Sequence, residues 1–65
     1  MTINAQRIET LLAEQGLTQK ALSERCGISK QSISAIIRRG TAAPKSAGKL
    51  ATGLGVPVAE ILKEA

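Results

Sequence analysis

The chain has 65 residues, enough for one small domain with a thin core, since a chain this short hides only about 60% of the surface that it exposes when unfolded. It contains no His, Asp, Tyr, Phe or Trp and a single Cys, so neither an acid–base relay nor a metal cage is expected. We therefore predict a protein that is not an enzyme, with no catalytic residues, cofactor or metal. Without aromatic rings, binding of single-stranded nucleic acid by base stacking is not expected either.

Basic side chains are segregated in the middle of the chain. The formal net charge is +4, yet residues 25–49 hold no acidic residue, whereas residues 1–24 and 50–65 are each mildly acidic. The basic residues of this middle segment are Arg25, Lys30, Arg38, Arg39, Lys45 and Lys49. Such segregation favours a polyanionic partner over a charged face that only contacts water.

The apolar residues indicate a cytoplasmic location. No uninterrupted apolar run exceeds three residues, so neither a signal peptide nor a membrane span is predicted. Cys26 has no second cysteine to pair with, and we expect it to be a small buried residue rather than a redox switch. We expect no membrane partner, since the basic third helix lacks the Trp or Phe of an interfacial anchor. A small-molecule substrate is not expected either.

Four glycines divide the chain into five pieces that we predict to be helices. Glycine ends a helix readily because it adopts the left-handed conformation without a Cβ clash. The four are Gly16, Gly27, Gly40 and Gly55. Apolar residues recur at helical spacing in the pieces, and no piece alternates with the period of a strand. In the first piece, the spaced residues are Ala5, Ile8, Leu11 and Leu12.

The starts of the later helices are also marked. Thr18 and Ser29 suit the N-caps of helices over residues 19–26 and 30–39. Ser46 is expected to cap the fourth helix, and Pro57 to occupy the first position of a fifth helix that reaches Ala65. Helices this short are not stable alone, so we predict an all-α fold in which residues 1–65 form a single domain held by packing.

The predicted third helix has two different faces. At 100° per residue, Ile33, Ile36 and Ile37 cluster on one side and are expected to face the core. The opposite side and the exposed first turn carry Lys30, Gln31, Ser34, Ala35 and Arg38. Lys and Gln side chains suit the edges of bases, and Arg can reach a base or a phosphate.

The stretch LTQKALSERCGISKQSISAIIRRG, residues 17–40, resembles the helix-turn-helix of the phage repressor and Cro family, also called the XRE family. Residues 44–62 are similar to the fourth and fifth helices of that family. The resemblance implies a compact five-helix lambda-repressor-like DNA-binding domain with its helix-turn-helix at helices 2 and 3. It implies base contacts from Lys30, Gln31, Ser34 and Ala35, and phosphate contacts from Gln19, Ser29, Arg38, Arg39 and Lys45. At Ala35 only a methyl is offered, so contact with thymine or no base reading is expected there.

Together these features predict a transcriptional regulator, a Cro/C1-type repressor that binds double-stranded DNA at a near-palindromic operator through its third helix. A second copy is also expected as partner, in a weak homodimer completed on the operator. Its candidate pairing surface comprises residues 40–44 and the last helix around Val58 and Leu62. The alternative is a protein-interaction module or antitoxin-type partner with the same fold, and only the DNA binder should lose duplex affinity steeply with added salt.

Overall fold

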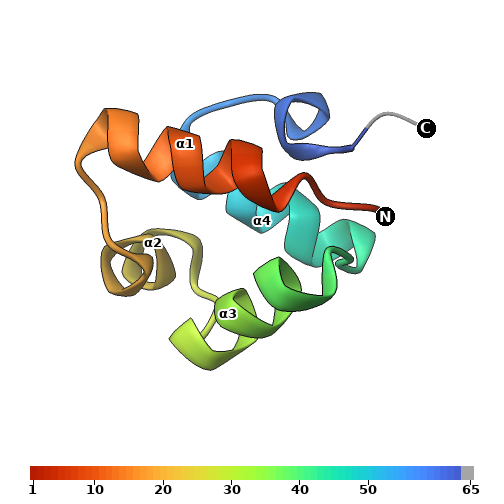
Figure 1. Ribbon diagram of the computed structural model, residues 1–65. Helices are drawn as coiled ribbons and strands as arrows, with labels where there is room; N and C mark the ends of the chain where they lie inside the picture. The colour runs from red at the N-terminus through yellow and green to blue at the C-terminus, as the bar shows by residue number, and fades with distance from the viewer. Residues whose placement is uncertain (64–65) are drawn as a thin grey trace.

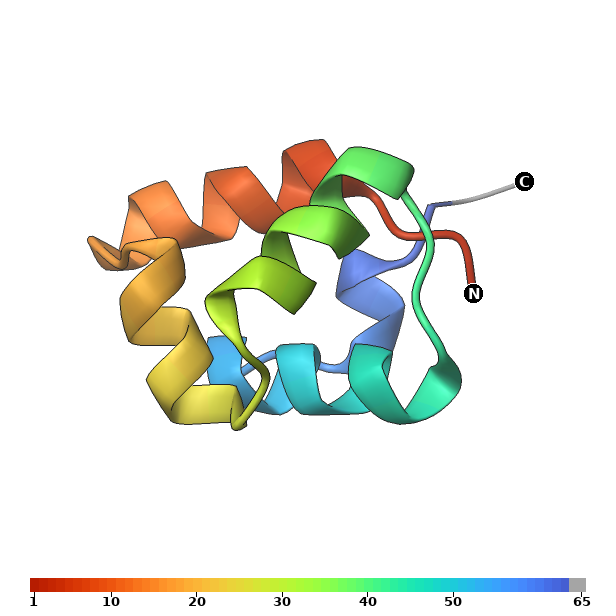
Figure 2. The same cartoon turned by 90° about the horizontal axis from the view of Figure 1, so that it is seen from below.

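The computed structural model describes residues 1–63, which form four α-helices and one 3₁₀-helix (Figure 1). The α-helices are α1 (Ala5–Gln15), α2 (Gln19–Cys26), α3 (Lys30–Arg39) and α4 (Pro44–Leu54), and the 3₁₀-helix is η1 (Val58–Ile61). Viewed from below, α3 lies on the near side between α1 and α4, with α2 at the left (Figure 2). None of the helices in residues 1–63 is long and apolar enough to span a membrane.

Side-chain caps set the starts of the first three helices. The side chains of Asn4, Thr18 and Ser29 accept hydrogen bonds from the backbone N–H groups three residues ahead. This confirms the predicted caps of α2 and α3, because each cap gives a partner to a first-turn amide that has none within the helix. The four predicted glycines all end helices, with φ between 65° and 74°.

The predicted start of α4 is wrong. The helix begins at Pro44 rather than after Ser46, and its N-cap is Ala43, which makes no side-chain capping bond. The reason lies in proline: its fixed φ suits the first helical position, and it lacks the N–H that would need a partner there. Ser46 therefore lies within the first turn of α4.

The predicted fifth α-helix is also wrong, because the chain forms the short η1 and then becomes extended at Leu62 (φ −88°, ψ 141°). Pro57 precedes η1 instead of occupying its first position. The C=O of Ile61 accepts from the N–H of Asn4 at 2.8 Å, and the N–H of Lys63 donates to the C=O of Thr2 at 3.0 Å. Backbone groups that would continue a helix are thus bonded to the N-terminal segment. Ala65 lies outside the described residues.

The N-terminal segment, residues 1–4, bonds to two separate parts of the backbone. Besides its bonds to the chain at and after the end of η1, it bonds to the loop after α3. There the N–H of Ile3 donates to the C=O of Gly40 at 2.7 Å, and the N–H of Ala42 donates to the C=O of Met1 at 3.0 Å. Two isolated β-bridges, Thr2 with Thr41 and Ile3 with Leu62, mark the same arrangement. The segment therefore ties the loop after α3 to the chain after η1.

The core is aliphatic, and α3 contributes one fully buried side chain to it. Ile33 is buried as predicted, whereas Ile36 and Ile37 are only half-buried and pack at the margin of the core. Cys26 is buried, in agreement with its expected role as a small apolar residue. The largest completely buried side chains are Ile8, Leu22, Ile33, Leu50 and Ile61. Around them α3 packs against α2 and α1, and α4 packs against α2 and η1.

The contact between α2 and α4 is close enough to require a glycine. A Cβ at Gly53 would lie 2.9 Å from the Cβ of Cys26 and 3.1 Å from Cδ1 of Leu22. A Cβ at Gly48, in the same helix, would meet no atom within 4 Å. The two glycines of α4 thus differ in packing while sharing the same helical context.

Replacing each of these glycines by alanine should change stability in opposite directions. Gly48→Ala should raise the free energy of unfolding by about 0.5–1 kcal/mol, because alanine loses less backbone entropy in a helix. Gly53→Ala brings the same gain but overpacks the contact with α2, which costs roughly 1–3 kcal/mol. Urea unfolding followed by helical circular dichroism measures both, and equal stabilisation by the two changes would contradict the close α2–α4 contact.

Candidate nucleic-acid interface

A three-residue turn holds α2 and α3 at a fixed crossing. α2 ends at Cys26 and α3 begins at Lys30, with Gly27, Ile28 and Ser29 between them. Gly27 is left-handed (φ 73°), and its N–H donates to the C=O of Ser23 at 3.0 Å. Ser29 is extended and caps α3. Since both ends of the turn are bonded, α2 determines the direction in which α3 leaves it.

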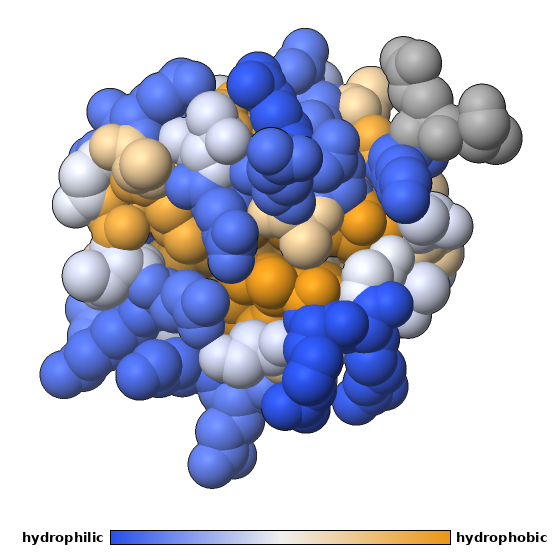
Figure 3. Space-filling model, in the orientation of Figure 1, coloured by the Kyte–Doolittle hydropathy of each residue, from blue (hydrophilic) through white to orange (hydrophobic). Residues whose placement is uncertain are grey.

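The outer side of α3 is polar and accessible. Lys30, Gln31 and Arg38 are exposed, and Ser34 is half-buried. These four residues line an open depression of about 440 Å³. In the space-filling view, hydrophilic atoms cover the lower side, where α3 lies, and hydrophobic atoms lie above them between α3 and α1 (Figure 3). The helix thus presents a hydrogen-bonding face to an external partner.

A second groove of about 490 Å³ separates α3 from the start of α4. Arg39 lines it from α3, and Thr41 and Ser46 line it from the opposite side. The first turn of α4 beside the groove has no side-chain cap and carries the exposed Lys45. This groove therefore combines a guanidinium, the hydroxyl groups of Ser32, Thr41 and Ser46, and the positive end of a helix.

Two of the predicted contact residues bond to each other. The hydroxyl of Ser34 in α3 donates to Oε1 of Gln19, the first residue of α2, at 2.8 Å. The hydroxyl of Ser29 is engaged within its own cap, where it accepts from the N–H of Ser32 and donates to Oγ of Ser32 at 2.9 Å. The polar groups at the α2–α3 junction are therefore already ordered by the protein.

The basic side chains of α3 are not neutralised within residues 1–63. The ion pair there joins Arg7 of α1 to Glu60 of η1 at 3.0 Å. No carboxylate of the described residues pairs with Lys30, Arg38 or Arg39. In the same part of the chain, no three His, Cys, Asp or Glu side chains gather into a group that could hold a metal ion. Uncompensated charge on a polar helix face attracts a polyanion.

A family model described as "Helix-turn-helix" matches residues 8–61. The chain belongs to this helix-turn-helix family. The match confirms the resemblance to the phage repressor and Cro family, and with it a DNA-binding domain of the transcription-regulator type. The comparisons with curated proteins and with solved structures found no match.

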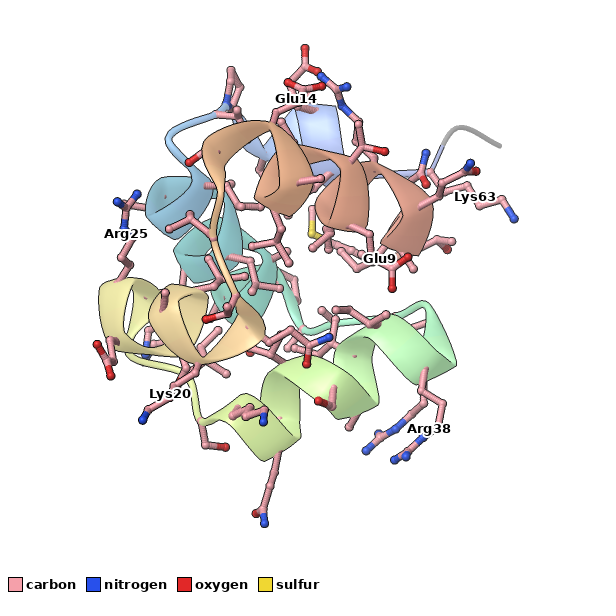
Figure 4. The ribbon with its side chains drawn as sticks, turned by 60° about the vertical axis from the view of Figure 1, so that its left-hand side comes forward. Glu9, Glu14, Lys20, Arg25, Arg38 and Lys63 are labelled. Carbon is pink, nitrogen blue, oxygen red and sulfur yellow. The ribbon has the colours of Figure 1, made fainter. Side chains whose placement is uncertain are left out.

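The helix-turn-helix carries a lysine that the charge pattern did not single out. Lys20, the second residue of α2, is exposed and lies on the same lower side as Arg38 (Figure 4). It was overlooked because residues 1–24 are acidic on balance and Glu24 stands one turn further along α2. Arg25 does belong to the basic segment, yet its side chain points away from this side (Figure 4).

Lys20 and Arg25 therefore form a matched pair of variants. Lys20→Ala should weaken duplex binding. It should also reduce the slope of the logarithm of the association constant against the logarithm of salt concentration by about 0.9, the value for one phosphate contact. Arg25→Ala removes the same charge from the same helix and should leave the salt slope unchanged. Fluorescence anisotropy with a labelled duplex at several salt concentrations measures both slopes. Equal slopes for the two variants would show that net charge, rather than position, determines binding.

Proposed function

We propose that this domain is a sequence-specific binder of double-stranded DNA that inserts α3 into the major groove and represses transcription by occluding a promoter. The observation that carries the proposal is the two-sided α3. Its inner face is anchored by the buried Ile33, and its outer face carries the exposed Lys30, Gln31 and Arg38. A helix of this diameter fits the major groove, where each base pair presents a distinct pattern of donors and acceptors.

Base contacts in this proposal come from the first turn of α3 and from the residues one turn later. Lys30 and Gln31 are exposed at the start of the helix, where a recognition helix contacts base edges. The long side chain of Lys30 can donate to the O6 or N7 acceptors of guanine, and the amide of Gln31 can bond both N6 and N7 of adenine. Ala35 offers its methyl to thymine, and Ser34 is the fourth residue for which the family resemblance implies a base contact.

Phosphate contacts in this proposal come from both sides of α3. Arg38 and Arg39 stand at its C-terminal end, and the exposed Lys45 stands in the first turn of α4. Gln19 and Ser29 lie at the starts of α2 and α3. Contacts of this kind fix the register of the protein on the duplex but carry no sequence information directly.

We further propose that two copies bind one operator. One recognition helix reads only about four or five base pairs, and proteins of this type pair so that two helices enter successive major grooves about 34 Å apart. Thr41, Ala43 and Pro44 are exposed, and Val58 and Leu62 are half-buried. The N-terminal segment lies between these two parts, since Thr2 bridges to Thr41 and Ile3 bridges to Leu62. This surface is small and has no aromatic anchor, so pairing should be weak in solution and completed on DNA.

The salt dependence of duplex binding tests the proposed function. If Lys20, Arg38, Arg39 and Lys45 neutralise phosphates, the logarithm of the association constant should fall with the logarithm of salt concentration at a slope near −4 for one protomer. Two protomers on one duplex should give a slope about twice as steep. A slope near zero would contradict DNA binding and favour the alternative, a protein-interaction or antitoxin-type module with the same fold.

Two exposed residues of α3 should separate base reading from phosphate contact. Gln31→Ala should cost about 1–3 kcal/mol on a duplex selected from a random library and relax preference at one base pair. Arg39→Ala should weaken binding to selected and unrelated duplexes by the same factor, because phosphates are common to all sequences. Competition binding with a panel of single-base-pair variants measures both effects. Equal losses on selected and unrelated DNA for Gln31→Ala would contradict its base-reading role.

A further inference from the structure

We propose that Ser34 is a positioning residue, whose hydroxyl orients the side chain of Gln19 toward the DNA backbone and takes no part in base reading. This inference rests on the proposed function of the α3 face and changes the role of one residue in it. In this role Ser34 makes no base contact, and it holds Gln19 in the orientation in which Gln19 contacts a phosphate.

The geometry of one hydrogen bond supports this role. The hydroxyl of Ser34 donates to Oε1 of Gln19 at 2.8 Å, between residues 15 positions apart in the sequence. Both side chains are half-buried at the α2–α3 crossing. A serine hydroxyl can donate a single hydrogen bond, and here Oε1 of Gln19 accepts it. In this arrangement Ser34 keeps no donor for the edge of a base.

The chemistry of the amide explains what the bond achieves. The side-chain amide of Gln19 is planar and carries one acceptor oxygen and an NH₂ group with two donors. Once Oε1 is held by Ser34, the NH₂ group must point away from that bond, and it remains the part of Gln19 that can donate to an anion. A phosphate oxygen is an acceptor only, so this orientation is the one that a DNA backbone requires.

The bond also reduces the cost of ordering Gln19 on binding. Glutamine is among the side chains that lose most rotamer freedom when they are immobilised. Because Ser34 and the crossing helices restrict Gln19 before DNA arrives, less of that entropy is lost in forming the complex. Base reading by α3 then depends on Lys30, Gln31 and the methyl of Ala35.

The test compares Ser34→Ala, Ser34→Thr, Gln19→Ala and the double variant Gln19→Ala/Ser34→Ala. The probes are a duplex selected from a random library with the unaltered protein, its single-base-pair variants and an unrelated duplex. Ser34→Ala should weaken binding about three- to ten-fold on every duplex, the effect expected for one net hydrogen bond. Its salt slope should be unchanged, because a neutral donor displaces no counterion. Ser34→Thr keeps the hydroxyl and should bind like the unaltered protein.

The double variant distinguishes positioning from a structural or base-reading role. If Ser34 acts through Gln19, Ser34→Ala should have less than a two-fold effect once Gln19 is alanine. The inference is overturned if Ser34→Ala alters preference at a single base pair, weakens binding equally in the Gln19→Ala background, or has no effect while the unaltered protein binds DNA. A lowered midpoint of thermal unfolding that accounts for the lost affinity also overturns it. If the unaltered protein itself shows no salt-dependent duplex binding, the proposed function has failed, and the role of Ser34 fails with it.

Discussion

The complete burial of Ile33 is the constraint on which the exposed side of this domain depends. α3 has ten residues, and Ile33 is its one fully buried side chain, so this contact sets the rotation of the helix about its axis. With 100° between successive residues, Gln31 and Arg38 then lie on the side away from the core, and Ser34 lies on the flank that meets α2. A core without aromatic rings must reach its packing density by close approach of helices. α2 and α4 approach so closely at Gly53 that a Cβ there would lie 2.9 Å from the Cβ of Cys26.

The long-range backbone bonds of the N-terminal segment connect this core to the loop after α3. Residues 1–4 bond to Gly40 and Ala42 on one side and to Ile61 and Lys63 on the other. The loop leads directly into α4, so the segment helps to set the separation between Arg39 and Ser46, which line opposite sides of the groove. Arg7 and Glu60 neutralise each other on α1 and η1, away from α3. Within residues 1–63, Lys30, Arg38 and Arg39 of α3 have no such carboxylate partner, so their positive charge stays available on the exposed helix-turn-helix.

Much of this arrangement is visible in the sequence because it is decided locally. The caps at Thr18 and Ser29 depend on bonds over three residues, and the two faces of α3 follow from helical spacing. The start of α4 and the short η1 were not predicted, since a proline overrides the serine two residues later and the N-terminal segment bonds to residues far away in the sequence. The bond between Gln19 and Ser34 depends on the angle between two helices, which no local pattern encodes. Lys20 was missed for a different reason: the net charge of a segment says nothing about the side on which one lysine lies.

Contact between DNA and the outer face of α3 with its immediate neighbours can be tested residue by residue. Nuclear magnetic resonance follows the backbone amide shifts of the isotope-labelled protein during titration with a duplex at low salt. The largest changes should fall on the first turns of α2 and α3, on Arg38 and Arg39, and on the start of α4. Changes around Glu9 and Glu14 of α1 should be small. Changes concentrated on α1 or η1, with α3 unaffected, would show that DNA does not bind through this face.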